Sequence, residues 1–107
     1  MFDQDFKLLT RNALDVELAL IFRHWDATPV QRAEFVGWAW VVAATADFSA
    51  SENRSAAAEL LRDERANLLR VLSERCVNTS EVSLELVSKR MFIDWLAGVL
   101  GADRVAA

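Results

Sequence analysis

Apolar residues recur every three or four positions along most of the chain, which is the spacing of an amphipathic α-helix. Near the start, one such line comprises Phe2, Phe6, Leu9, Ala13, Val16 and Leu20. A second line lies well over a third of a turn away and comprises Leu14, Leu18, Ile21 and Trp25. Asp3 and Asp5 suit a helix N-terminus because they face the positive end of the helix dipole. We therefore predict a first helix over about residues 3–25 with two apolar faces.

Helix-capping signals divide the rest of the chain. Thr28, Pro29 and Gln31 form a capping box with proline at the first helical position, and they predict a second helix over about residues 30–46. Ser49 and Glu52 repeat the capping-box spacing, so a third helix is expected over about residues 50–76. No glycine or proline enforces the break between these two helices, and one continuous or bent helix is the alternative.

The last helix is expected over about residues 79–100. Asn78 and Glu81 have the spacing of an N-terminal cap, and Gly101 suits the left-handed residue that closes a helix. Residues 101–107 then form a tail. The pattern predicts one all-α domain, residues 1–107, with a four-helix bundle-like architecture.

Composition adds a prediction about assembly. Apolar residues make up 53% of the chain, and the segment from Phe35 to Ala44 is apolar on every side of its helix. A domain of this size hides only about two thirds of its unfolded surface. We therefore predict a homodimer that buries the surplus, with the interface for the second copy or another protein drawn from Leu14, Leu18, Leu20, Phe22, Trp25, Trp40, Phe92, Trp95 and Val99. The alternative is that the four tryptophans fill one dense core within a single chain.

Charge argues against two classes of partner. The net charge is −4 and the basic residues are scattered, so direct binding of nucleic acid is not expected. The uncharged run from Phe35 to Ala46 is too short to span a bilayer and lacks the Lys and Arg of a membrane-surface helix. The acidic start is unlike the basic start of a signal peptide. A cytoplasmic protein without membrane contact is expected.

Few residues offer chemistry. His24 is the single histidine and is interpreted as a partly packed boundary residue, and Cys76, the single cysteine, as a small apolar filler at a helix end. One Cys and one His do not supply a structural zinc site. Asp94, which apolar residues surround in sequence, is expected to pair with Arg90 one turn earlier. We predict no catalytic, cofactor-binding or metal-binding residues.

The expected function follows from the surplus of apolar faces. A helix with a second apolar face suits docking between helices, so the sequence predicts a non-enzymatic regulator that acts by protein–protein interaction. An inhibitor or anti-activator of a transcription regulator or other effector fits this description. The alternative is an enzyme or small-ligand-binding protein with an apolar pocket lined by Trp38, Trp40, Met91 and Trp95.

Overall fold

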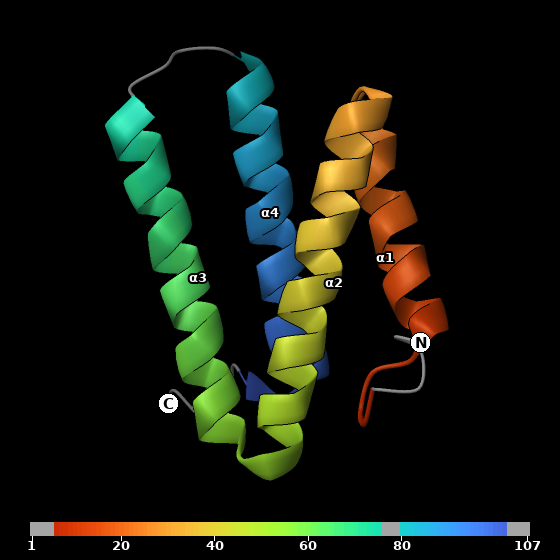
Figure 1. Ribbon diagram of the computed structural model, residues 1–107, viewed down its shortest axis with the longest axis vertical. Coiled ribbons are helices and arrows are strands. Elements are labelled where there is room, and N and C mark those ends of the chain that lie inside the picture. Colours follow the sequence, from red (N-terminus) through yellow and green to blue (C-terminus); the bar gives the residue numbers. More distant parts are fainter. Residues whose placement is uncertain (1–5, 76–79, 103–107) are drawn as a thin grey trace.

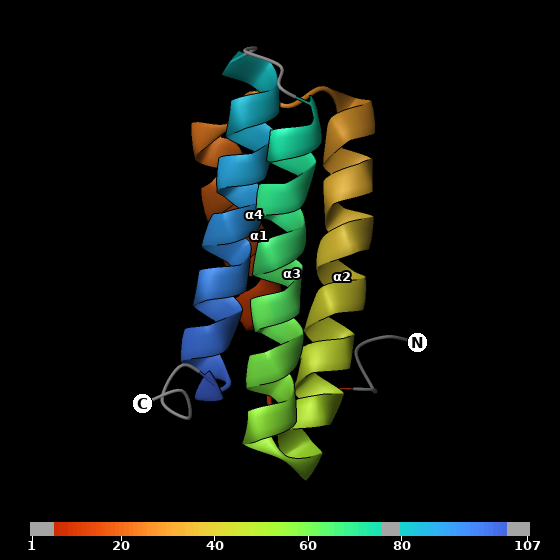
Figure 2. The same ribbon diagram turned by 90° about the vertical axis from the view of Figure 1, so that its left-hand side faces the viewer.

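The structure is a computed structural model that describes residues 6–75 and 80–102, with side chains described for 6–71 and 84–102. In these ranges it contains four α-helices and no strand: α1 (Arg11–His24), α2 (Pro29–Glu52), α3 (Arg54–Arg75) and α4 (Ser80–Val99). The helices run alternately up and down, and α4 packs against all three others (Figures 1 and 2). The predicted all-α fold is confirmed, whereas the completion of a bundle by a second copy stays a prediction.

Helix α1 begins at Arg11, and residues 6–10 before it are not helical, although the sequence predicted helix there. The predicted start near Asp3 lies outside the described residues. The Thr10 side chain accepts a hydrogen bond from the Ala13 amide, at 3.1 Å, and so caps α1. Just before it, the amides of Lys7, Leu8 and Leu9 donate to the Asp47 carboxylate of α2. Because these amides point at a side chain about forty positions away, residues 7–9 are held in a non-helical course.

The second helix starts as predicted and ends later. Thr28 and Gln31 form the expected capping box, with hydrogen bonds of 2.8 and 3.1 Å. Asp47 and Ser49 do not break the helix, which continues to Glu52, so the predicted end at residue 46 and the second capping box are wrong. The turn falls at Asn53, whose side-chain oxygen accepts from the Ser55 amide at 2.8 Å. Helices α2 and α3 are therefore separate, as predicted, but the residue that marks the break between them is Asn53.

The end of α4 agrees with the sequence prediction. Gly101 has a φ of +71° and lies just past the helix, in the left-handed region that glycine adopts without steric cost. The predicted cap at Asn78 lies in residues 76–79, outside the described residues. The same holds for residues 103–107 of the predicted tail.

The core is built around six aromatic rings contributed by α1, the residue that follows it, α2 and α4. We call this set the aromatic cluster: Phe22, Trp25, Phe35, Trp38, Phe92 and Trp95. Neighbouring ring centroids are 5.4 to 6.3 Å apart, in tilted or edge-to-face geometry. Phe35 and Phe92 are fully enclosed at its centre. Lys89 lies over the Trp38 ring and Arg32 over the Phe22 ring, each at 5.1 Å, so cations cover its edges.

One charged residue lies in the core. Asp47 has no exposed surface, and its two carboxylate oxygens accept the Lys7 amide at 2.6 Å, the Leu8 amide at 2.9 Å and the Leu9 amide at 2.6 Å. A buried carboxylate is tolerated when several hydrogen bonds replace its water shell. Phe6 continues this contact by packing on Trp40 of α2, with ring centroids 5.4 Å apart. Residues 6–9 are thereby fastened along α2, and we call them the N-terminal strap.

Candidate protein-binding groove between α3 and α4

The outward side of α4 carries a row of exposed apolar side chains. Leu84, Val87 and Met91 are spaced by three and four positions, so they share one side of the helix. Their exposed fractions are 42%, 53% and 44%. Their helical neighbours Phe92, Ile93 and Leu96 point into the core instead. The helix therefore has one apolar face that the chain buries and a second that it leaves open.

A small groove lies between α3 and α4, and its lining residue Arg90 is the chain neighbour of Met91 in this row. It is lined by the side chains of Arg65, Leu68 and Leu69 from α3 and Arg90 from α4, and it encloses about 90 Å³. Leu69 is 59% exposed, which is unusual for a leucine of a packed helix. The floor is apolar and the walls are cationic. A volume of this size suits one or two inserted side chains better than a whole small molecule.

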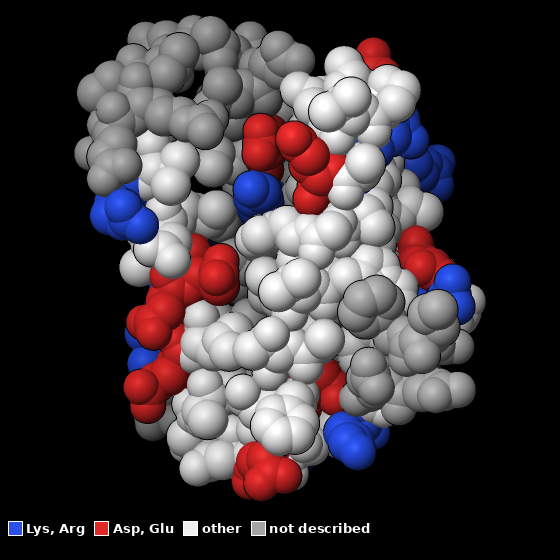
Figure 3. Space-filling view, viewed as in Figure 1, with Lys and Arg blue, Asp and Glu red and all other residues white. Residues whose placement is uncertain are grey.

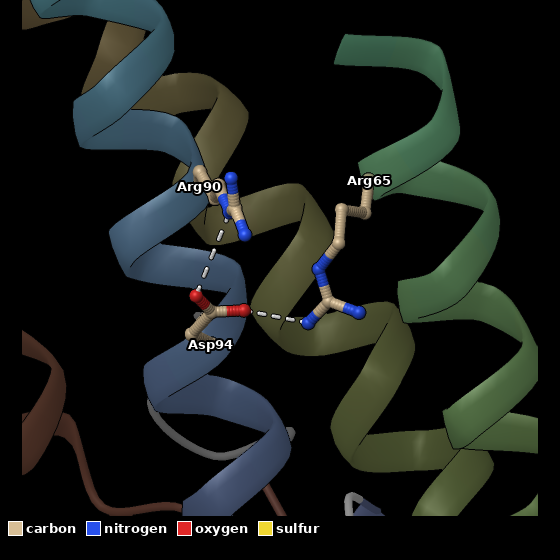
Figure 4. A network of polar contacts seen from close by, with 3 residues as sticks. All are labelled: Arg65, Arg90 and Asp94. Carbon is tan, nitrogen blue, oxygen red and sulfur yellow. Dashed lines mark hydrogen bonds and ion pairs between the residues drawn. The ribbon is translucent and has the colours of Figure 1, made fainter. Parts of the chain in front are cut away.

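Asp94 contacts both arginines of the groove, Arg65 and Arg90. An Arg65 guanidinium nitrogen lies 2.6 Å from one Asp94 oxygen, and the Arg90 Nε lies 4.0 Å from the other (Figure 4). The carboxylate is about half exposed, so these ion pairs stabilise the fold only slightly. Two guanidinium groups share one carboxylate, which leaves the network with one net positive charge. The predicted Asp94–Arg90 pair is present, and Arg65 adds the contact that ties α4 to α3.

The nine residues predicted as an interface fall into three groups. Four of them lie in the core of the single chain, which corrects their assignment to a surface: Leu14, Leu18, Trp25 and Phe92. Three are partly buried and packed against that core: Phe22, Trp40 and Trp95. Leu20 and Val99 are 44% and 48% exposed, and they alone present much apolar surface. The aromatic residues of this set are thus largely buried within one chain. This agrees with the alternative interpretation, in which the tryptophans fill the core of a single chain.

The four residues predicted to line a small-molecule pocket do not surround the groove. Trp38 is packed between Phe35 and Phe92, at 5.4 and 5.6 Å, and Trp95 rests on Phe92 at 5.7 Å. Trp40 lies beneath Phe6 of the N-terminal strap. Met91 points outward on α4 and is 44% exposed. Their rings therefore serve packing, and the groove between α3 and α4 is lined by other residues.

The remaining titratable candidates occupy ordinary positions. His24 is exposed at the last residue of α1, and Cys76 lies outside the described residues. Burial raises the pKa of the Glu17 carboxyl, which is partly enclosed on α1. Within the described part of the chain, no three His, Cys, Asp or Glu side chains are grouped as a metal site would require.

Sequence reasoning missed three features that the structure makes prominent. The line of Leu84, Met91 and Trp95 is visible in the sequence, but periodicity does not say which of two lines on α4 faces the core. Asp47 has the signature of a helix break because acidic residues are common at caps, and only its tertiary contacts reveal a buried acceptor. Nothing in the sequence separates the exposed Leu69 from its partly buried neighbour Leu68.

Comparisons with protein families, with curated proteins and with solved structures find no match to this chain. Among the described residues, no helix has both the length and the apolar character needed to cross a membrane.

Proposed function

We propose that this protein is a non-enzymatic regulator that acts by binding another protein, as an inhibitor or anti-activator of a transcription regulator or other effector. The observation that carries the proposal is the groove between α3 and α4, with the exposed apolar row of α4 at its edge. Exposed apolar side chains arranged along one helix side are the usual docking surface for a partner helix.

The chemistry of the groove specifies the kind of segment that fits. Leu68 and Leu69 offer an apolar floor, which favours an inserted leucine, isoleucine or phenylalanine. Arg65 and Arg90 carry two positive charges against the single negative charge of Asp94. A carboxylate on the partner would complete this network with charge-assisted hydrogen bonds. The proposed ligand is therefore an amphipathic helix that presents an apolar side chain beside an Asp or Glu.

Position-specific crosslinking tests the proposal. A photo-reactive phenylalanine analogue at Val87, at the groove edge, is expected to crosslink one partner protein in the native cell. The same analogue at Glu59, an exposed residue of α3 that does not line the groove, is the matched control and is expected to leave that partner uncaptured. Identification of the partner then allows binding to be measured with the purified proteins.

Two substitutions decide whether the groove itself is responsible. Leu69→Glu places a charge on the apolar floor of the groove, and Arg90→Glu reverses the charge opposite the expected carboxylate. Each is expected to weaken partner binding by roughly 30-fold or more, as loss of a central contact does. Both residues are largely exposed, so the fold should survive. Equal crosslinking from Val87 and Glu59, or unchanged binding by both variants, would overturn the proposal.

A further inference from the structure

Helix α3 is well packed along its first half and lightly covered along its second. Ala57 and Leu61 are 0% and 2% exposed, whereas none of residues 62–71 is buried. Helices α2 and α3 diverge from their turn at Asn53, so the far half of α3 lies away from α2 and beside α4 (Figures 1 and 2). The position of this far half therefore depends on its contacts with α4.

The Arg65–Asp94 ion pair lies where the packed half of α3 gives way to the open half. Arg65 follows Leu61 by one helical turn, and its guanidinium group donates to the Asp94 carboxylate of α4 at 2.6 Å. The same carboxylate holds Arg90 of its own helix more loosely, at 4.0 Å. Because Arg65 and Asp94 belong to different helices, their contact fixes how far α3 stands from α4 beside the groove (Figure 4).

The carboxylate of a partner would compete with Asp94 for Arg65. Arg65 and Arg90 line the groove but Asp94 does not, so Asp94 contacts the two guanidinium groups from outside it. The hydrogen bond from Arg65 to Asp94 uses one terminal nitrogen. A guanidinium group pairs more strongly with a carboxylate that accepts two parallel N–H bonds. A carboxylate that enters from the groove can form that pair and replace Asp94.

We propose that the Arg65–Asp94 ion pair is a clasp that keeps the groove narrow in the free protein and is released when an acidic partner binds. The partner carboxylate takes Arg65 from Asp94, and the far half of α3 moves away from α4. The space between Leu68 and α4 then widens and admits the apolar side chain of the partner. This inference rests on the proposed function, because it describes how the proposed groove opens.

The distribution of charge directs an acidic partner to the clasp. Acidic side chains gather over α3 on the face seen in Figure 3. The arginine pair lies on the opposite side, because α2 lies in front of α4 in Figure 1 and passes behind α3 and α4 in Figure 4. An acidic partner is therefore repelled from one face of α3 and attracted to the other. An uncharged partner offers Arg65 no charge in exchange for Asp94.

The clasp is weak enough to be released by a partner. The Asp94 side chain is 53% exposed, and ion pairs that are open to solvent shift an equilibrium by roughly twofold to fivefold. A ligand that binds the open form better than the closed form shifts the population by the ratio of its two affinities. One well-formed pair between Arg65 and a partner carboxylate is therefore sufficient to reverse the preference for the closed form.

Pulsed electron spin resonance on the free chain tests the clasp without any ligand. Spin labels at Val41 of α2 and Ala66 of α3, which are both exposed, report how far α3 stands from the rest of the bundle, with Cys76 replaced by serine. Asp94→Asn is expected to raise the fraction of molecules with the longer distance by roughly twofold to fivefold. An unchanged distribution of distances in Asp94→Asn would overturn the proposal.

Glu85→Gln is the matched control for the loss of charge. It also removes one negative charge from α4, but the ion pair that it breaks joins Glu85 to Lys89 within that helix. The distances should then stay as in the unmodified chain. Equal widening in Glu85→Gln and Asp94→Asn would show a general effect of net charge and would contradict a clasp at Asp94.

Peptide binding provides a second test. The probe is a synthetic amphipathic helix that carries a leucine one turn from a glutamate, and the matched probe has glutamine in place of the glutamate. The unmodified chain should bind the glutamate peptide more tightly than the glutamine peptide. Asp94→Asn should bind the glutamate peptide roughly twofold to fivefold more tightly still, because no internal carboxylate has to be displaced. Weaker or unchanged binding by this variant would contradict the clasp.

The clasp and the groove fail separately. Distances that respond to Asp94→Asn, together with peptide binding that Leu69→Glu does not weaken, would support the clasp and refute binding in the groove. Peptide binding that Leu69→Glu abolishes, together with distances that Asp94→Asn leaves unchanged, would support the groove and refute the clasp.

Discussion

Replacing Asp47 by asparagine should destabilise the fold although the side-chain shape is conserved. One carboxylate oxygen accepts both the Leu8 and Leu9 amides, and the other accepts the Lys7 amide. An asparagine oriented to keep the first two bonds directs its own NH₂ group at the Lys7 amide, so two donors meet. The two remaining bonds lose the charge that makes hydrogen bonds to carboxylates roughly twice as strong as neutral ones.

The expected size follows from these contacts. Hydrogen bonds to charged groups contribute about 1.5–3 kcal/mol each, and neutral ones about 1 kcal/mol. The Leu9 bond is buried, whereas the other two are partly open to solvent and can be replaced by water once the strap lifts. We expect Asp47→Asn to lower the free energy of unfolding by about 2–3 kcal/mol, and Asp47→Ala by about 3–5 kcal/mol. For a domain of this size, the asparagine effect corresponds to a drop of about 10 °C in Tm.

Urea unfolding followed by circular dichroism measures the loss, and amide hydrogen exchange locates it. Exchange at Lys7, Leu8 and Leu9 should accelerate before exchange in the helices does. Asp94→Asn is the control, because that carboxylate is half exposed and its ion pairs should contribute at most about 1 kcal/mol. Equal stability of the Asp47→Asn and Asp94→Asn variants would refute the assignment of the strap to this carboxylate.

Three further outcomes are expected. Phe35→Ala, at the centre of the aromatic cluster, should cost about 3–5 kcal/mol in urea unfolding, and a loss below about 1 kcal/mol would mean that the cluster is loosely packed. Thr28→Ala removes the capping box of α2 and should cost about 1 kcal/mol by the same measurement, with Thr10→Ala as a comparable change at α1. Burial raises the pKa of Glu17, so its ionised form opposes folding and stability falls as pH rises through that pKa. Glu17→Gln should therefore raise Tm at pH 7 and lose this advantage below about pH 4, where the carboxyl is neutral in both states; a gain that is equal at both pH values would exclude this explanation.

Local signals in the sequence were reliable where neighbouring residues alone decide the structure. Thr28 and Gln31 satisfy each other across one turn, and Gly101 adopts its backbone angle without help from the rest of the chain. The all-α fold follows from such signals together with the helical period. The start of α1 and the end of α2 could not be predicted in this way, because both depend on Asp47 meeting amides about forty positions away.

The candidate site depends on a choice that periodicity leaves open. On α1, the line of Leu14, Leu18 and Ile21 faces the core, whereas Val16 and Leu20 of the other line stay exposed. Both lines have the same spacing, so periodicity alone does not indicate which one is buried. The buried line is set by how the helices pack, with α4 in contact with α1, α2 and α3. Aromatic residues were expected at an interface because of their size, but size equally favours mutual packing inside the chain. Among the described residues, the exposed large apolar side chains are instead mainly aliphatic, and Phe48 is the one aromatic ring among them.

The reach of the strap contact bears on the order in which the chain folds. Each helix can nucleate from neighbouring residues in microseconds, but the Lys7, Leu8 and Leu9 amides find no carboxylate until α2 has taken shape. We therefore expect the strap to dock late, after the folding transition state. Loss of the Asp47 contact should leave the refolding rate nearly constant and raise the unfolding rate. Asp47 would then act mainly on the lifetime of the native state.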